Sequence, residues 1–461
     1  MKIDRETKAK IIIIYSACLI FAVMLTVLLS VLLTPKQTYN EDPTPPVAEP
    51  AAAPSASVEK ETPAEARPDI SEEKPVQDPA EHERAIRDPL VSLKGNGEDE
   101  VTVMIYMNGS NLESFAGFAT DDIREMLKAD YNEKLHILIE TIGTQYWQRY
   151  NISSDHTQRY AIEDFKLVLK DDTLPQLNCS EAANLCDFIR WSSTNYPADR
   201  YILILWDHGG GAVDGFGYDE WSEYEESLTL DGIKWALDTA GVDFDFIGMD
   251  ACIMSSIETC YALYDHCDYC ILSEDFESAI GWSYRDWITQ LSRNTSVSTE
   301  ELAKTIIDDM VNENDNSFMG SSSTLALIDE RYIPQVMDAW LEFAYANEAD
   351  LLNNNYSREV NRSERAMPAK VDAMMQSYYI TDMLALAGSI DSPQSKPLAS
   401  RLDSAIVYYN CTLDDSGLTG LAVTLPYNDV VFYHDLGPVF AGIGIEKRYI
   451  EWLGRFQQEW E

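Results

Sequence analysis

Positive charge and histidine are both scarce in this 461-residue sequence. Lysine and arginine number 34 against 78 aspartate and glutamate residues, so the formal net charge is −44 at pH 7. A surface of this charge repels nucleic-acid phosphates, which argues against a nucleic-acid partner. A cationic substrate or a metal ion fits such a surface, and a plain role in solubility also explains it.

Several motifs are missing, and each absence argues against a class of enzyme. There are only six histidines and no H-E-x-x-H pattern, so a zinc peptidase is not expected. No G-x-S-x-G elbow occurs, which weakens the serine esterase that an H-G-G-G stretch would otherwise suggest. Among the eight cysteines, Cys267 and Cys270 form a C-x-x-C whose surroundings do not resemble a redox centre, and the spacing of Cys179 and Cys186 indicates no particular pairing.

A long uncharged apolar run covers residues 11–33, IIIIYSACLIFAVMLTVLLSVLL. At about 1.5 Å per residue, a helix of this length crosses a hydrocarbon core of about 30 Å. Lysine and arginine precede the run and acidic residues follow it, which predicts a cytoplasmic tail at 1–10 and an extracytoplasmic remainder. We expect a single-pass anchor in the cell membrane, because the run is too long for a typical cleaved signal peptide.

Residues 34–99 are rich in proline, alanine and glutamate. Such a composition buries too little apolar surface to offset chain entropy, so we expect a disordered linker. Residues 100–461 are then the globular domain.

Within this domain, strand-like and helix-like segments alternate. Apolar runs at 101–107, 135–143, 201–206 and 244–251 are separated by amphipathic helical patterns at 121–129, 184–195 and 228–241. This order predicts an α/β fold, an open and mostly parallel sheet with helices on both faces. In such sheets, reactive groups gather beyond the carboxyl ends of the strands.

Two of these strand ends carry chemically reactive side chains. His208 and three glycines follow one strand in LILWDHGGG, and Cys252 follows the next strand in GMDACIMSS. One crossover helix separates the two strands, so we expect the two loops to lie side by side. A helix start after Cys252 is expected to favour the thiolate, and the glycine amides can hold a developing oxyanion. Alone, a buried cysteine or a strand-ending histidine is ordinary packing; together they predict an acyl-transfer site.

These stretches, YPADRYILILWDHGGG and FDFIGMDACIMSSIETCYALYDHCDYCILSEDFESAIGWSY, resemble the clostripain-like cysteine peptidases, relatives of caspases, gingipains and legumain in fold. The resemblance extends to VTVMIYMNGSNLE, to STLALIDERYIPQVMDAW and to GLTGLAVTLPY, which looks like the family's final core strand. It implies a caspase-like fold and a thiol peptidase that cleaves proteins or peptides after arginine or lysine.

The resemblance also implies roles for particular residues. His208 and Cys252 match the family's catalytic pair, and Gly209 would supply an oxyanion-hole amide together with the backbone of Cys252. Asp250 matches an acid in the pocket for the basic residue before the scissile bond, and Asp286 is a candidate second acid there. The chemistry requires no cofactor and no metal.

The sequence departs from the family in the loop between the histidine and the cysteine. Relatives are often activated by cleavage at a basic residue there, but AVDGFGYDEWSEYEES has no lysine or arginine before Lys234. The loop's carboxylates are a candidate calcium site, although they lack the regular spacing of a calcium loop, and a solvated acidic loop is the plainer interpretation. A surface-binding module that kept the fold and lost activity is the alternative function.

Overall fold

The computed structural model describes residues 84–222, 227–316, 323–352, 380–412, 417–426 and 430–457. The predicted tail at 1–10, the predicted anchor at 11–33 and the predicted linker as far as residue 83 lie outside these residues. Within the described part of the chain, no helix combines the length and the apolar character that crossing a bilayer requires. The anchor therefore stays a prediction from the sequence.

Nine strands of the described residues form one sheet, in the order β10-β8-β7-β6-β5-β1-β2-β3-β4. The five central strands all pair in parallel, as the sequence predicts. They are β1 (Val101–Asn108), β2 (Leu135–Ile142), β5 (Arg200–Trp206), β6 (Phe244–Asp250) and β7 (Cys267–Leu272). Antiparallel strands complete both edges: β3 (Gln158–Glu163) and β4 (Lys166–Asp171) at one, β8 (Thr324–Asp329) and β10 (Ile406–Cys411) at the other.

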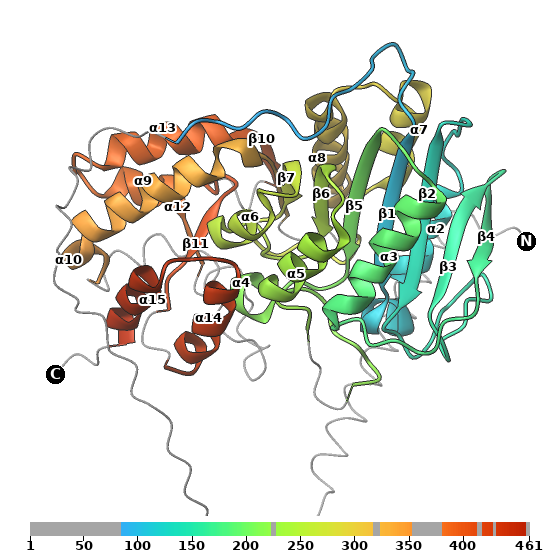
Figure 1. Cartoon of the computed structure of the whole chain (residues 1–461), viewed down its shortest axis with the longest axis horizontal. Coiled ribbons are helices and arrows are strands. Elements are labelled where there is room, and N and C mark those ends of the chain that lie inside the picture. Colours follow the sequence, from blue (N-terminus) through green and yellow to red (C-terminus); the bar gives the residue numbers. More distant parts are fainter. Residues whose placement is uncertain are drawn as a thin grey trace, which may run out of the picture. The chain divides into compact units, whose positions relative to one another are not determined.

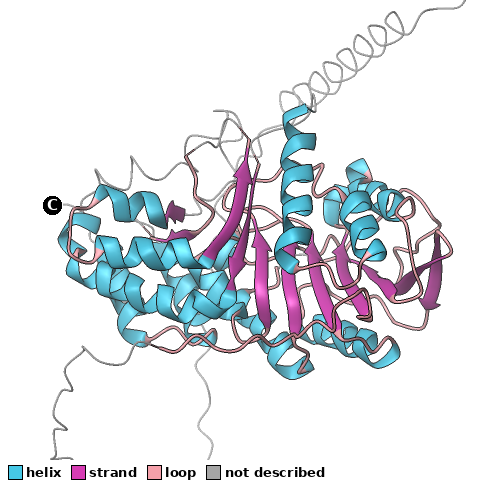
Figure 2. Ribbon diagram, turned by 90° about the horizontal axis from the view of Figure 1, so that it is seen from above, coloured by secondary structure: helices cyan, strands magenta, loops and turns pink. Residues whose placement is uncertain are grey.

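Helices cover both faces of the sheet, as the views in Figures 1 and 2 show. On one face lie α2 (Phe118–Met126), α7 (Tyr284–Arg293) and α8 (Thr299–Asn316). On the other lie α3 (Ala182–Asn195), α5 (Leu230–Ala240), α6 (Ile257–Leu263) and α9 (Ile333–Ala346). Alternate residues of β1 enter different cores, Val103 and Ile105 on one side and Met104 and Tyr106 on the other. Because both faces are buried, the central strands are apolar throughout.

The stretch expected as a final core strand does form a buried strand, but outside the main sheet. Ala422–Thr424 (β11) pairs antiparallel with Ile380–Asp382 (β9) in a separate two-stranded sheet. A single bridge between Ala422 and Ser256 places β11 beside the start of α6. The last strand of the main sheet in chain order is instead β10, which pairs with β8 at the edge.

Residues 84–94, predicted as part of the linker, are instead packed against the domain. The buried carboxylate of Asp268 accepts hydrogen bonds from the Arg87 guanidinium at 2.7 Å and from the backbone amides of Leu90 and Val91, both at 2.9 Å. Asp268 is the second residue of β7, so this segment, which we call the entry strap, crosses the amino ends of the strands (Figure 1). The packed domain therefore starts no later than residue 84, because an acid in the sheet holds the strap.

A buried ion pair fixes the start of β5, the strand that leads to His208. Arg200 is fully buried and donates to Asp245 at 2.7 Å and to the carbonyl of Val297 at 2.8 Å. The hydroxyl of Thr299 donates to the second oxygen of Asp245, also at 2.7 Å. Three elements, β5, β6 and the start of α8, thus meet at one charge pair.

We expect Asp245→Ala to lower the free energy of unfolding by about 3–5 kcal/mol, because it leaves the Arg200 charge buried without a carboxylate. The matched control is Asp130→Ala, which breaks the Arg293–Asp130 pair, 2.7 Å long between side chains that are 72% and 56% exposed. That exposed pair contributes less than about 1 kcal/mol. Urea unfolding of both variants checks the prediction, and equal losses would contradict it.

Candidate active site

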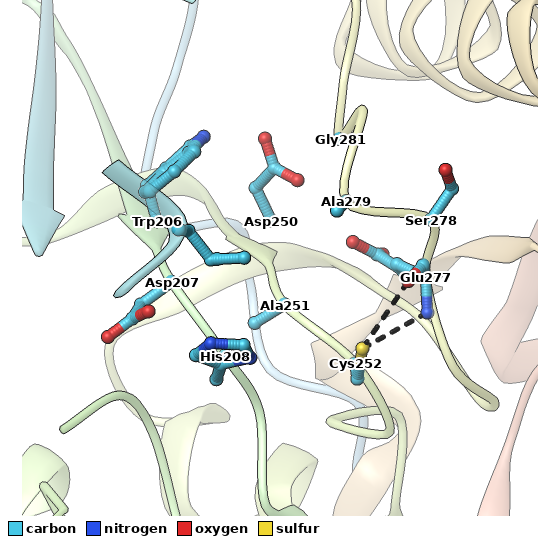
Figure 3. A pocket seen from close by; sticks show the side chains of 11 residues that line it. Trp206, Asp207, His208, Asp250, Ala251, Cys252, Glu277, Ser278, Ala279 and Gly281 are labelled. Carbon is cyan, nitrogen blue, oxygen red and sulfur yellow. Dashed lines mark hydrogen bonds between the residues drawn. The ribbon is translucent and has the colours of Figure 1, made fainter. Parts of the chain in front are cut away.

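The register of β5 and β6 brings two reactive side chains to one place. Trp206 pairs with Asp250 across these parallel strands, and His208 and Cys252 each follow two residues later. Both line one pocket of about 100 Å³ at the carboxyl edge of the sheet (Figure 3). The other lining residues are Leu112, Trp206, Asp207, Asp250, Ala251, Glu277, Ser278, Ala279 and Gly281.

Gly209 allows the two loops to touch. A β-carbon built on Gly209 would lie 1.9 Å from the carbonyl oxygen of Cys252, so any side chain there would push the loops apart. Among the described residues, the amides of Gly209 and Cys252 donate no hydrogen bond. Two unused amides beside a thiol can act as donors to an oxyanion.

The backbone directly after Cys252 is strained. Ile253 has a φ of 51°, in the left-handed region that a β-branched residue rarely adopts. Its amide donates to the carbonyl of Asp275 at 2.9 Å, which clamps this turn to the loop after β7. Strain of this kind persists where surrounding contacts enforce it, and it is concentrated at functional sites.

The thiol of Cys252 is held in its neutral form. The sulfur accepts a hydrogen bond from the amide of Glu277 at 3.2 Å and lies 3.6 Å from the same residue's carbonyl (Figure 3). Burial, with a smaller effect from the Glu277 charge, raises the pKa of Cys252 to about 12. The expectation that a helix start lowers this pKa is wrong, because α6 begins only at Ile257 and burial dominates.

The imidazole of His208 is fixed by two neighbours. Its Nε2 lies 2.7 Å from Oδ1 of Asn111, and its ring stacks on Tyr218 with centroids 5.6 Å apart. Burial lowers the pKa of His208, so the neutral ring is favoured. An amide oxygen facing Nε2 requires the proton on that nitrogen, which leaves Nδ1 as the proton acceptor.

Two acids stand beside the thiol and the imidazole. The buried Asp250 carboxylate accepts hydrogen bonds from the amide of Trp282 at 3.2 Å and from the hydroxyl of Tyr284 at 2.9 Å. Burial raises the pKa of Asp250 to about 6. Burial and the neighbouring Asp250 charge raise the pKa of Glu277 well above its usual range. One of its carboxyl oxygens, Oε1, is buried without a hydrogen-bond partner among the described residues, while the carboxyl group as a whole interacts with Asp250 and Trp282.

Asp286 does not join this pocket. Its carboxylate is half-exposed on α7 and accepts from the Arg285 guanidinium at 2.7 Å. Tyr284 opens α7 with its side chain turned inward to Asp250, and two residues further the helix has rotated by about 200°, so Asp286 faces outward. The second acid beside the thiol is therefore Glu277.

Sequence reasoning missed Glu277 and Asn111. Both lie on loops, where neither residue type nor spacing indicates which side chains will meet. Asn111 lies three residues after the end of β1, in the MNGSNLE motif. Its position as a polar residue beyond a strand's carboxyl end is the one signal that points to it.

In the acidic loop after β5, the carboxylate of Asp219 holds backbone amides. Asp219 accepts from the amides of Cys179 at 3.0 Å and Trp221 at 2.8 Å. In the part of the chain that the structure describes, no group of three or more histidine, cysteine, aspartate or glutamate side chains is arranged to hold a metal. Residues 223–226, which include three glutamates of this loop, lie outside the described residues. Six of the described cysteines are free thiols: Cys179, Cys186, Cys252, Cys260, Cys267 and Cys270.

A parallel sheet with a thiol and an imidazole in one pocket at its carboxyl edge is the arrangement of a cysteine peptidase. The sequence model of the clostripain family, peptidase family C11, matches residues 105–403, well over half of the chain. The chain therefore belongs to the clostripain family.

Individual relatives agree with this family. Clostripain of Hathewaya histolytica is 29% identical over an alignment of 199 residues, and the match covers 36% of this chain and 36% of that protein. A secreted C11 cysteine protease from Bacteroides thetaiotaomicron, solved with an irreversible peptide inhibitor, superposes with a TM-score of 0.54 and 16% identity over 75% of this chain and 99% of that one. An inactive zymogen C11 protease from Parabacteroides distasonis superposes with a TM-score of 0.50 and 18% identity, and the match covers 73% of this chain and 98% of that one. At these identities, the two structures establish the fold.

We expect Asp250→Asn to gain stability relative to wild type as the pH rises. The folded-state pKa of Asp250, about 6, lies above the unfolded value of about 4. The contribution of a protonated Asp250 is therefore complete below pH ~4 and is lost as the pH rises through about 6, whereas asparagine does not titrate. The difference in unfolding free energy between variant and wild type should shift by about 1–3 kcal/mol in favour of the variant between pH 4.5 and pH 8.

Urea unfolding at both pH values measures this shift. Asp286→Asn is the matched control, because that carboxylate is half-exposed and its pKa is lowered by Arg285 rather than raised. If the difference in unfolding free energy between Asp250→Asn and wild type is the same at both pH values, the burial of an ionisable acid at this position is contradicted.

Proposed function

We propose that the chain is a cysteine endopeptidase that cleaves peptide bonds after arginine or lysine, with Cys252 as nucleophile and His208 as general base and acid. The observation that carries the proposal is the shared pocket, in which a thiol, an imidazole and two buried acids face the same space. Family membership supports the reaction class, and the pair of acids supports a cationic side chain before the scissile bond.

In the proposed reaction, Nδ1 of His208 takes the thiol proton while the sulfur of Cys252 attacks the carbonyl carbon. The oxygen becomes negatively charged and accepts from the amides of Gly209 and Cys252. His208 then gives the proton to the leaving amine, and the carbon–nitrogen bond breaks to leave a thioester on Cys252. A water molecule, deprotonated by His208, releases the new carboxylate.

The acids in the pocket have a second effect on this chemistry. After burial, the charge of Glu277 contributes most to the raised pKa of Cys252, and the charges of Asp275 and Asp250 contribute less. A bound arginine or lysine side chain would pair with these charges and remove much of their influence on the sulfur. The thiol would then ionise more easily with a cationic substrate in place than without one, which favours the correct substrate during the chemical step.

Cellular placement and cofactors belong to the same proposal. The uncharged run at 11–33 would anchor the chain in the cell membrane with the peptidase domain outside the cytoplasm. The reaction uses only side chains and backbone amides of this chain, so it needs no cofactor, and calcium binding by the acidic loop stays a prediction.

We expect Cys252→Ala to abolish hydrolysis of fluorogenic arginine and lysine reporters. Asp250→Asn should lower kcat/KM for these reporters by about 100-fold or more, because a buried cation loses its charged partner. A norleucine reporter, which has the length of lysine without its charge, should lose far less. The measurement is kcat/KM of the full chain and of both variants on the arginine, lysine and norleucine reporters.

Asp286→Asn is the control for this experiment, because the same chemical change is made outside the pocket, and its kcat/KM should match wild type. Cleavage that survives Cys252→Ala would overturn the assignment of the nucleophile. An equal loss on lysine and norleucine reporters in Asp250→Asn would overturn the assignment of the cation pocket.

Asn111 is proposed as a positioning residue for His208. Asn111→Ala should lower kcat by about tenfold or more while KM changes little, because the ring loses the partner that selects its tautomer. Asn111→Asp keeps an oxygen acceptor and should restore most of the rate. Steady-state kinetics on the arginine reporter separates these values, and a change confined to KM would contradict a positioning role.

A further inference from the structure

Three aromatic side chains are exposed on loops beyond the carboxyl ends of the strands. Phe115 is 90% exposed in the turn after β1 (Leu112–Ala116), Tyr146 is 57% exposed after β2, and Trp221 is 47% exposed after β5. Large apolar side chains gain free energy when they leave water, so exposed ones on linked loops can serve as an interaction surface. We call these three residues the aromatic platform.

One carboxylate ties together the loops that carry the platform. Glu220 accepts from the hydroxyl of Ser114 at 2.7 Å, from the hydroxyl of Thr144 at 3.0 Å and from the amide of Gln145 at 2.8 Å. Each platform residue directly follows a member of this network: Phe115 follows Ser114, Tyr146 follows Gln145, and Trp221 follows Glu220. The platform is therefore a built surface whose three loops are held by charge-assisted hydrogen bonds.

The platform is continuous with the imidazole side of the pocket. Leu112, which lines the pocket, is the first residue of the turn that carries Phe115. Asn111 bonds the ring of His208, and Tyr218, two residues before Glu220, stacks on it. The platform loops follow β1, β2 and β5, whereas Glu277 follows β7, so the two lie on opposite sides of β6 in the sheet.

This placement decides which part of a substrate reaches the platform. Under the proposed function, His208 donates a proton to the leaving amine, so it must stand on the leaving-group side of the scissile bond. The basic side chain before that bond occupies the pocket between Asp250 and Glu277. The polypeptide that follows the bond then runs past His208 toward the loops after β5, β1 and β2.

We propose that the aromatic platform binds apolar side chains of the substrate within the first few residues after the scissile bond. This inference rests on the proposed function and adds a second determinant of specificity to the cation pocket. Apolar residues suit the platform because aromatic rings offer large, stiff contact surfaces at low entropic cost. Acidic residues are disfavoured there by the net charge of −44.

The test compares two internally quenched peptides that differ only after the scissile arginine, one continuing with Leu-Phe and one with Ser-Gly. A short arginine reporter whose leaving group is a small fluorogenic amine has no residues there at all. We expect wild type to cleave the Leu-Phe peptide about tenfold faster, in kcat/KM, than the Ser-Gly peptide. Trp221→Ala and Phe115→Ala should each remove most of this preference and leave the short reporter unchanged.

The matched control is Trp235→Ala, because Trp235 is 49% exposed but lies on α5, on a face of the sheet rather than at its edge. Phe115→Ala is the variant least able to disturb folding, since its ring is almost wholly in solvent. Equal losses on the peptides and the short reporter in both platform variants would assign these residues a structural role and overturn the proposal.

The remaining outcomes also discriminate. A preference for Leu-Phe that survives both platform variants would overturn the proposal, and a change in oligomeric state in Trp221→Ala by sedimentation would instead identify the platform as a contact between copies. Failure of wild type to hydrolyse the short reporter contradicts the proposed function itself, and the platform inference with it. Hydrolysis of the short reporter without any difference between the peptides contradicts the platform inference alone.

Discussion

The site depends on the contact between two loops that leave neighbouring strands at the same level. The parallel register of β5 and β6 sets this level, since Trp206 and Asp250 are opposed and each loop continues from there. The absence of a side chain at Gly209 then lets one backbone rest against the carbonyl of Cys252. Buried strands make this geometry rigid, because a slip of one residue would reverse every side chain between the two cores. Imidazole, thiol and amides are thus placed before any substrate arrives.

The electrostatics of the site follow from placing acids where water is scarce. A buried carboxyl destabilises the folded chain at neutral pH, and the charge of Asp250 adds to the cost of ionising Glu277. The same unmet charge is what makes a cationic side chain a favourable occupant. The neutral thiol and neutral imidazole fit this arrangement, since an ion pair between them would be formed in a negative and desolvated environment. The buried acids thus lower the stability of the folded chain at the same place where they favour a bound cation.

Sequence patterns reveal those parts of the fold and site that burial dictates. The central strands are recognisable because both their faces are covered, and His208 and Cys252 stand out because polar residues end apolar runs. The antiparallel strands β4 and β10, at the two edges of the sheet, are harder to recognise, since edge strands carry a weaker apolar pattern. Asn111 and Glu277 reach the pocket through loop conformation, which no periodicity encodes. Asp286 was a wrong candidate for the pocket, because Tyr284 on the same helix faces inward and a residue two positions later faces outward.

The entry strap has a consequence for where the peptidase works. It enters the domain along the amino ends of the strands, held by Arg87 and Asp268, while the pocket opens at the carboxyl ends. The strap therefore lies at the end of the sheet opposite the mouth of the pocket. Because the strap and the pocket lie at opposite ends of the strands, a contact made through the strap leaves the mouth of the pocket open to substrate.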